Sequence, residues 1–162
     1  MPKNQSKTDP MKILEIVANV GILPIKLGMK SVEIQQSMAD RNFELSASAH
    51  KMDYYADNAI QVEFGSNDEA QFIGISSSNA LKVIYLGMEV FCEPAKKVFD
   101  HIQKHETQNT DKFNGEEHIF YDQVITLWDA DTQYNYCGGR FKVWGQIGIG
   151  NQEYLDAIAE FN

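Results

Sequence analysis

The chain has 162 residues, of which 43% are hydrophobic and 11% aromatic, and its 23 acidic against 14 basic residues give a formal charge of −9. This composition excludes a disordered chain and predicts a packed globular domain. So much negative charge also argues against binding to nucleic acid or to an anionic membrane, whose phosphates would repel it. It favours a basic protein partner instead.

The beginning of the chain divides into a polar segment and the start of the domain. Residues 1–10 (MPKNQSKTDP) predict a flexible tail, and residues 11–162 predict a single domain. The apolar run after Met11 contains Glu15 and has no small-residue cleavage site, so it does not predict a signal peptide. No apolar stretch approaches the ~20 residues that a membrane-spanning helix needs. We therefore expect a soluble, cytoplasmic protein.

The first predicted half covers about residues 20–78. ILPIKL predicts a strand that ends at Gly28, and Ser31 is a candidate cap for a helix in which Ile34 and Met38 lie one turn apart. AIQVEF and EAQFIGIS, joined by the turn residues GSND, predict an antiparallel hairpin.

The second predicted half covers about residues 79–150 and repeats this order. LKVIYL predicts a strand that ends at Gly87, and FCEPAKKVFDHIQKH predicts a helix with Pro94 in its first turn. HIFYDQVITLW and FKVWGQIGIG predict further strands. NQEYLDAIAEF predicts a closing C-terminal helix capped by Asn151.

Five letters recur almost unchanged, as IKLGM at residues 25–29 and IYLGM at residues 84–88. Glycine ends a strand and lets the backbone turn sharply, so the repeat predicts one strand-to-helix corner that is used twice. Together with the repeated order of elements, it predicts an α+β fold of two related halves, each a helix packed on antiparallel strands.

Motifs for catalysis are not evident in the sequence. There is no glycine-rich phosphate loop and no G-x-S-x-G serine elbow. His101 and His105 lie four residues apart and offer half a metal site, but HIQKH lacks the glutamate of a zinc protease, and an exposed pair is the favoured interpretation. We therefore predict a protein that is not an enzyme and holds no metal or cofactor.

The two cysteines, Cys92 and Cys137, fit no zinc spacing. A disulfide is one interpretation. Two buried free thiols in a reducing compartment are the interpretation that apolar and aromatic surroundings favour.

Acidic and aromatic residues gather in the second half. Residues 106–139 contain seven acids and one base, interleaved with tyrosines and Trp128. Aromatic side chains anchor protein interfaces, and carboxylates steer and pair with basic groups. The pattern predicts a partner-binding face that consists of Glu116, Glu117, Asp122, Trp128, Asp129, Asp131, Tyr134 and Tyr136.

The stretch IKLGMKSVEIQ resembles the corner that occurs twice in the tandem-repeat beta-lactamase inhibitory proteins, which fold as helices on a curved antiparallel sheet. Those inhibitors carry disulfides and a secretion signal, which this sequence does not predict. In size and acidity, and in the segments IKLGMKSVEI and GQIGIGNQEYLDAI, the chain resembles immunity proteins of bacterial polymorphic and contact-dependent inhibition toxins.

The resemblance to immunity proteins implies a monomer or dimer that binds and neutralises a cognate protein toxin. A nuclease toxin would present a basic surface, because its substrate is rich in phosphate. Two alternatives stay open. One is a structural or small-ligand-binding domain of a larger complex. The other is a hydrolase that uses paired carboxylates, such as Glu116 with Glu117 or Asp129 with Asp131.

Overall fold

The computed structural model describes residues 11–108 and 112–161, so the predicted tail at 1–10 lies outside the described residues. Three α-helices and two β-sheets confirm the α+β class. The helices are α1 (Ser31–Asp40), α2 (Ala95–Gln103) and α3 (Gln152–Ala159), with a short 3-10 helix, η1 (Thr132–Tyr134). The strands are β1 (Lys12–Val17), β2 (Gly21–Leu23), β3 (Ile25–Lys26), β4 (Leu45–Ala49), β5 (Met52–Tyr55), β6 (Ile60–Phe64), β7 (Ala70–Ser76), β8 (Leu81–Tyr85), β9 (Met88–Glu89), β10 (Glu117–Phe120), β11 (Ile125–Asp131) and β12 (Val143–Gly150).

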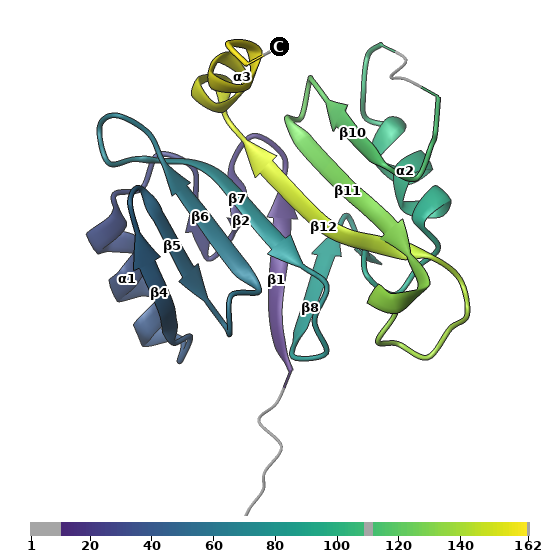
Figure 1. Cartoon of the computed structure of the whole chain (residues 1–162), viewed down its shortest axis with the longest axis horizontal. Helices are drawn as coiled ribbons and strands as arrows, with labels where there is room; N and C mark the ends of the chain where they lie inside the picture. Colours follow the sequence, from purple (N-terminus) through teal and green to yellow (C-terminus); the bar gives the residue numbers. More distant parts are fainter. Residues whose placement is uncertain (1–10, 109–111, 162) are drawn as a thin grey trace, which may run out of the picture.

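The strands form one large and one small sheet. The large sheet has the order β10-β11-β12-β7-β6-β5-β4, and the small sheet has the order β3-β2-β1-β8-β9. All pairs in the large sheet are antiparallel, whereas β1 and β8 pair in parallel at the centre of the small sheet. In Figure 1 the small sheet lies behind the middle of the large one, with α1 toward one side and α2 toward the other. None of the helices in the described part of the chain is long and apolar enough to cross a membrane.

The core lies between the large sheet and this second layer. Ile34 and Met38 of α1 and Val98 and Ile102 of α2 are fully buried in it, as the helical spacing predicts. The large sheet contributes a row of aligned, buried residues that crosses six of its strands, namely Asp53, Val62, Ile73, Ile149, Ile125 and Phe120.

We call the opposite side of the large sheet the outer face, and no second layer of strands covers it in residues 11–108 and 112–161. Strand register places its residues in three rows: Met52, Glu63, Phe72 and Gly150; Tyr54, Gln61, Gly74, Gly148, Thr126 and Ile119; and Ser76, Gln146, Trp128 and Glu117. Helix α3 packs against this side, through a stack of Tyr154 on Phe72 with ring centroids 4.5 Å apart.

The predicted hairpin forms as β6 and β7, and the predicted cap of the last helix also forms, since the Asn151 side chain accepts a hydrogen bond from the Tyr154 amide at 3.1 Å. The repeated corner is different. Gly28 lies just before α1, but Leu86 and Gly87 form the turn of the β8–β9 hairpin, and α2 starts later, at Ala95. Both turn residues have positive φ, 45° and 84°. The predicted strand-to-helix corner is therefore wrong for the second copy.

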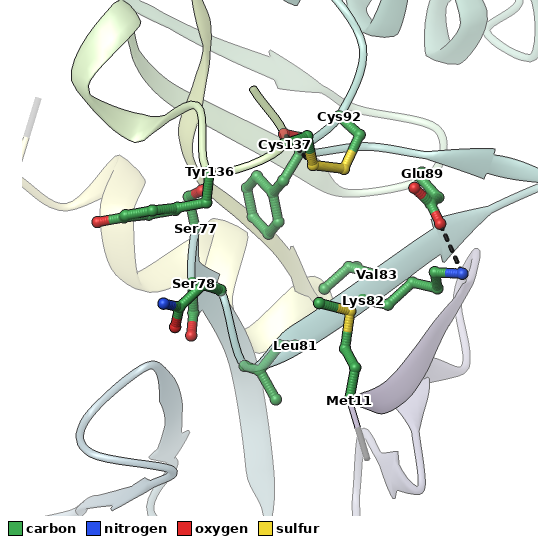
Figure 2. A pocket seen from close by; sticks show the side chains of 12 residues that line it. Met11, Ser77, Ser78, Leu81, Lys82, Val83, Glu89, Cys92, Tyr136 and Cys137 are labelled. Atoms are coloured by element: carbon green, nitrogen blue, oxygen red, sulfur yellow. Dashed lines mark hydrogen bonds and ion pairs between the residues drawn. A yellow bond between two sulfur atoms is a disulfide. The ribbon is translucent and has the colours of Figure 1, made fainter. Parts of the chain in front are cut away.

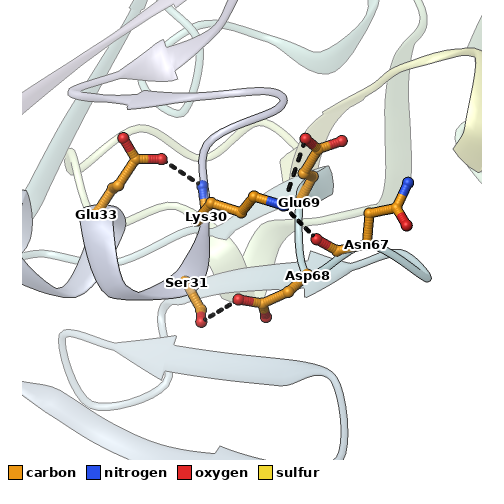
Figure 3. Close-up of polar contacts among 6 residues, drawn as sticks. All are labelled: Lys30, Ser31, Glu33, Asn67, Asp68 and Glu69. Carbon is orange, nitrogen blue, oxygen red and sulfur yellow. Dashed lines mark hydrogen bonds and ion pairs between the residues drawn. The ribbon is translucent and has the colours of Figure 1, made fainter.

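The N-terminus of α1 is fastened to the turn between β6 and β7 (Figure 3). The Lys30 ammonium donates to the Asn67 carbonyl at 2.7 Å and lies 3.7 Å from the Glu69 carboxylate. The N-cap residue of α1 is Lys30, so Ser31 is the first helical residue and not the predicted cap. The Ser31 hydroxyl instead donates to the Asp68 carboxylate at 2.8 Å. These contacts fix the helix at one end of the large sheet.

The two cysteines form a disulfide, with their Cα atoms 5.5 Å apart. The favoured prediction of two free thiols is therefore wrong. The bond joins the segment before α2 to the loop after η1, where the Ala95 amide also donates to the Lys142 carbonyl at 2.9 Å. Cys92 and Cys137 are separated by 45 positions in the sequence, which gave no local signal for this pairing.

We expect the variant Cys92→Ala/Cys137→Ala to lose about 2–4 kcal/mol of unfolding free energy, because the disulfide closes a long loop in the unfolded chain. Denaturant unfolding with and without a reducing agent measures the loss. The reducing agent should destabilise the wild type and leave the double variant unchanged. Two reactive thiols in the unreduced, denatured wild type would contradict the pairing.

Glycine is required where Phe72 lies across the outer face. A Cβ atom at Gly148 would come within 2.4 Å of the Phe72 ring and 2.8 Å of the Thr126 hydroxyl, and one at Gly74 would come within 3.0 Å of the same ring. The paired glycines thus give the aromatic ring its place on the sheet.

We expect Gly148→Ala to cost about 1–3 kcal/mol of unfolding free energy, as overpacking does. Denaturant unfolding measures this cost. The same substitution in a Phe72→Leu background should cost less, because the smaller side chain leaves room. Equal costs in both backgrounds would show that the ring does not set the requirement.

Candidate functional site

Exposed aromatic and acidic side chains gather at the β10–β11 end of the outer face. We call this group the Trp128 patch, and it consists of Glu116, Glu117, Ile119, Tyr121 and Trp128, which together with Asn114 line an open depression. Half of the Trp128 side chain (50%) and more of Tyr121 (64%) is exposed to solvent. Glu117 lies directly across from Trp128 on the neighbouring strand. Large aromatic side chains left exposed beside carboxylates are typical of a protein-binding surface.

The two glutamates of the patch have free carboxylates. The Asn114 side-chain oxygen accepts from the Glu116 amide at 2.7 Å and from the Glu117 amide at 3.4 Å, which holds the backbone at the start of β10. Both side chains are exposed, and neither carboxylate makes a hydrogen bond or ion pair with any residue that the structure describes. Their charge is therefore available to a partner.

Asp122, by contrast, is used within the chain. Its carboxylate accepts from the Thr107 hydroxyl at 2.7 Å and from the Thr107 amide at 2.6 Å. These two hydrogen bonds lower the pKa of Asp122 below its ordinary value, because they stabilise the ionised form. Glu106 accepts in return from the amides of Asp122 and Gln123, both at 3.1 Å. Asp122 thus joins the loop after α2 to the β10–β11 turn.

Asp129, Asp131 and Tyr134 hold the η1 loop together. The Tyr134 hydroxyl donates to the Asp129 carboxylate at 2.6 Å, and this bond raises the pKa of Tyr134 because it favours the protonated form. Asp131 caps η1 by accepting from the Gln133 amide at 2.9 Å. The Tyr134 ring lies over Gly145, where a Cβ atom would come within 2.7 Å of it.

Tyr136 is exposed but lies away from the patch, beside the disulfide (Figure 2). It lines a largely apolar cavity of about 60 Å³ with Leu81, Val83 and Phe91. Small-molecule sites usually measure ~300 Å³ or more. This cavity therefore gives no support to the small-ligand alternative.

The candidate histidine pair packs around a buried tyrosine. His101 and His105 lie with their ring centroids 5.4 Å and 6.2 Å from that of Tyr85, and His101 Nε2 is 3.3 Å from the Leu86 carbonyl. Within residues 11–108 and 112–161, no group of three or more His, Cys, Asp or Glu side chains is placed to hold a metal ion.

The structure thus brings together three of the eight predicted residues, Glu116, Glu117 and Trp128. It adds Tyr121 and Ile119, which the prediction left out. Glu117 and Ile119 alternate along β10, and this period of two was the signal that places them on one side of the strand, whereas Tyr121 lies in the turn that follows it.

In comparisons with known proteins, no family model, curated protein or solved structure matches the chain. The function is therefore inferred from this surface itself.

The β10–β11 hairpin carries an acid that accepts internal hydrogen bonds, Asp122, and one that accepts none from the described residues, Glu117, so the two roles can be compared by substitution. We expect Asp122→Ala to lower the free energy of unfolding, because it removes two hydrogen bonds, and Glu117→Ala to leave it unchanged within ~0.5 kcal/mol. The pKa of Asp122 is lowered in the folded state, so its contribution should be full above the ordinary pKa and disappear as the pH falls through the lowered one. Chemical unfolding at several pH values measures both variants, and equal stabilities at neutral pH would contradict the assignment.

Proposed function

We propose that the protein is an immunity protein, which binds a basic protein toxin through the outer face of its large sheet and neutralises it by covering its surface. The supporting observation is the charge of this face. None of the residues in its three rows is Lys or Arg, and two of them, Glu63 and Glu117, are acids.

Charge and shape favour a protein as the partner. The outer face repels phosphates and a second copy of itself, because it carries carboxylates without basic residues to balance them. Tyr54, Met52 and Ile119 are half-buried apolar groups on the same face, and Trp128 and Tyr121 protrude further. A stable complex buries roughly 800 Å² on each partner, which a seven-stranded face can supply.

A toxin that cleaves nucleic acid would need a basic surface, and the acids of the outer face would compete for it. Inhibition of this kind requires no catalysis by the inhibitor. Attraction over several ångströms raises the rate of encounter, so the complex forms before the toxin reaches its substrate.

We place this activity in the cytoplasm, as the sequence predicts. That compartment keeps most thiols reduced, whereas the structure contains the Cys92–Cys137 disulfide. The disulfide lies outside the Trp128 patch, so neutralisation should not depend on it. The Cys92→Ala/Cys137→Ala variant is expected to protect cells as the wild type does.

The test begins with the protein encoded next to this gene, which we expect to be basic, expressed with and without the present protein. We expect it to kill cells unless the present protein is co-expressed. Association of the purified pair should slow by about tenfold or more in Glu117→Lys and lose part of its dependence on salt, because a steering charge is reversed.

Glu15→Lys is the matched control. It makes the same change of charge on an exposed strand residue of the small sheet, on the far side of the molecule. Its association rate should stay close to that of the wild type. Equal slowing by both variants would show that only net charge matters and that the outer face is not the interface.

A further inference from the structure

We infer that the Trp128 patch receives an arginine side chain of the partner, with the guanidinium stacked on the indole and paired with the Glu117 carboxylate. This inference rests on the proposed function only in taking the partner to be a basic protein. It assigns to the patch a preference for one kind of cation, which negative charge alone does not provide.

The first support is the arrangement around the indole. Glu117 and Gln146 lie opposite Trp128 on the two neighbouring strands. Side chains at such positions have Cβ atoms ~4.5–5.5 Å apart. The Gln146 amide extends toward Gly74, so the group beside the exposed indole that can accept hydrogen bonds from a stacked guanidinium is the Glu117 carboxylate.

The second support is the absence of an internal cation. No Lys or Arg lines the depression among the described residues, and the carboxylates of Glu116 and Glu117 are unpaired there. Elsewhere on the surface some acids are paired with lysine, for example Asp100 with Lys96 at 2.9 Å and Glu93 with Lys97 at 2.7 Å. The patch thus combines two open charges with an open aromatic face.

Arginine fits this combination better than lysine. Its guanidinium is planar and weakly hydrated, so it stacks on an aromatic ring and still donates two parallel hydrogen bonds to a carboxylate. An ammonium group is a compact, strongly hydrated charge and gains less from the indole. The contact with the ring is worth about 0.5–1 kcal/mol at an exposed site.

A second copy of the chain is the competing occupant. Arg140 is exposed in the loop before β12 and could be presented to the patch of another molecule. The unbalanced acids of the outer face oppose such an approach, so we commit to a separate basic partner.

The two tryptophans make a direct test practicable. Trp144 is fully buried and donates to the Ala95 carbonyl at 2.9 Å, whereas Trp128 is half exposed. Quenching of fluorescence by acrylamide in the wild type therefore reports on Trp128. Hexa-arginine should protect this fluorescence from quenching, and hexa-lysine at the same concentration should protect it less.

Binding of labelled peptides, followed by fluorescence anisotropy, gives the affinities independently of tryptophan. We expect the wild type to bind hexa-arginine about two- to fivefold more tightly than hexa-lysine, which corresponds to the stacking contact. Trp128→Leu should abolish this preference while weaker, salt-dependent binding persists. Glu116→Gln/Glu117→Gln should weaken the binding of both peptides.

Trp144 emission in Trp128→Leu serves as the control for folding, since it should remain that of a buried indole. Equal affinities for the two peptides in the wild type, or a preference that survives in Trp128→Leu, would overturn the inference. So would protection of Trp128 that appears without peptide as the protein concentration rises, because a second copy would then occupy the patch.

The outcomes separate this inference from the proposed function. If the neighbouring protein is not bound but the preference for arginine holds, the immunity function fails and the arginine site stands. If the neighbouring protein is bound and neutralised but the wild type shows no preference, only the arginine site fails.

Discussion

The antiparallel pairing of β7 with β12 is the contact on which the rest of the molecule depends. It joins strands from the two halves of the chain into one seven-stranded sheet, and the aligned isoleucines Ile73 and Ile149 carry the buried row across the junction. The same pairing sets Gly74 opposite Gly148 on the other side of the sheet. The junction therefore provides both a continuous core and, on the outer face, the space that the Phe72 ring occupies.

The candidate site follows from how the chain uses its acids. Asp122 accepts hydrogen bonds from the loop after α2, and Asp129 and Asp131 accept them from residues of η1, so these acids help to hold the β10–β11 hairpin in position. Glu116 and Glu117, at the edge of the same hairpin, have no such partner among the residues that the structure describes. The acids that stabilise the hairpin through hydrogen bonds and the acids that are available to a partner are thus different residues, although both groups belong to one acidic segment.

Periodic patterns in the sequence predicted those helices and strands that bury one side against the core and expose the other. The helical stripe of α2 and the alternation of β6 are unambiguous, and the structure has both. β4 was not predicted, because LSASA is small and exposed throughout and carries no apolar alternation. The second LGM corner and the Cys92–Cys137 pairing were predicted wrongly, since each depends on which distant segments meet.

For the site, the composition of the sequence predicted an acidic and aromatic surface, but it did not predict which residues form that surface. The carboxylate of Asp131, which caps η1, and that of Glu117, which faces solvent, have the same chemistry, and only the positions of nearby hydrogen-bond donors distinguish their roles. Trp128 and Trp144 illustrate the same limit. Both lie on strands of the large sheet, yet the aromatic cluster around Phe113 and His118 covers only the second.

The parallel pairing of β1 with β8 also has a consequence for how the chain folds. Lys12 meets Leu81, and Ser76 of β7 meets Gln146 of β12, so the central pairs of both sheets join residues that are far apart in sequence. Such topology has a high contact order, and closing long loops before the contacts form slows folding. The hairpin of β6 and β7 can form early, and the small sheet needs no strand later than β9, but the large sheet is not complete until the last long strand, β12, is available. During synthesis the edge of β7 that pairs with β12 therefore stays unpaired until nearly the whole chain has been made.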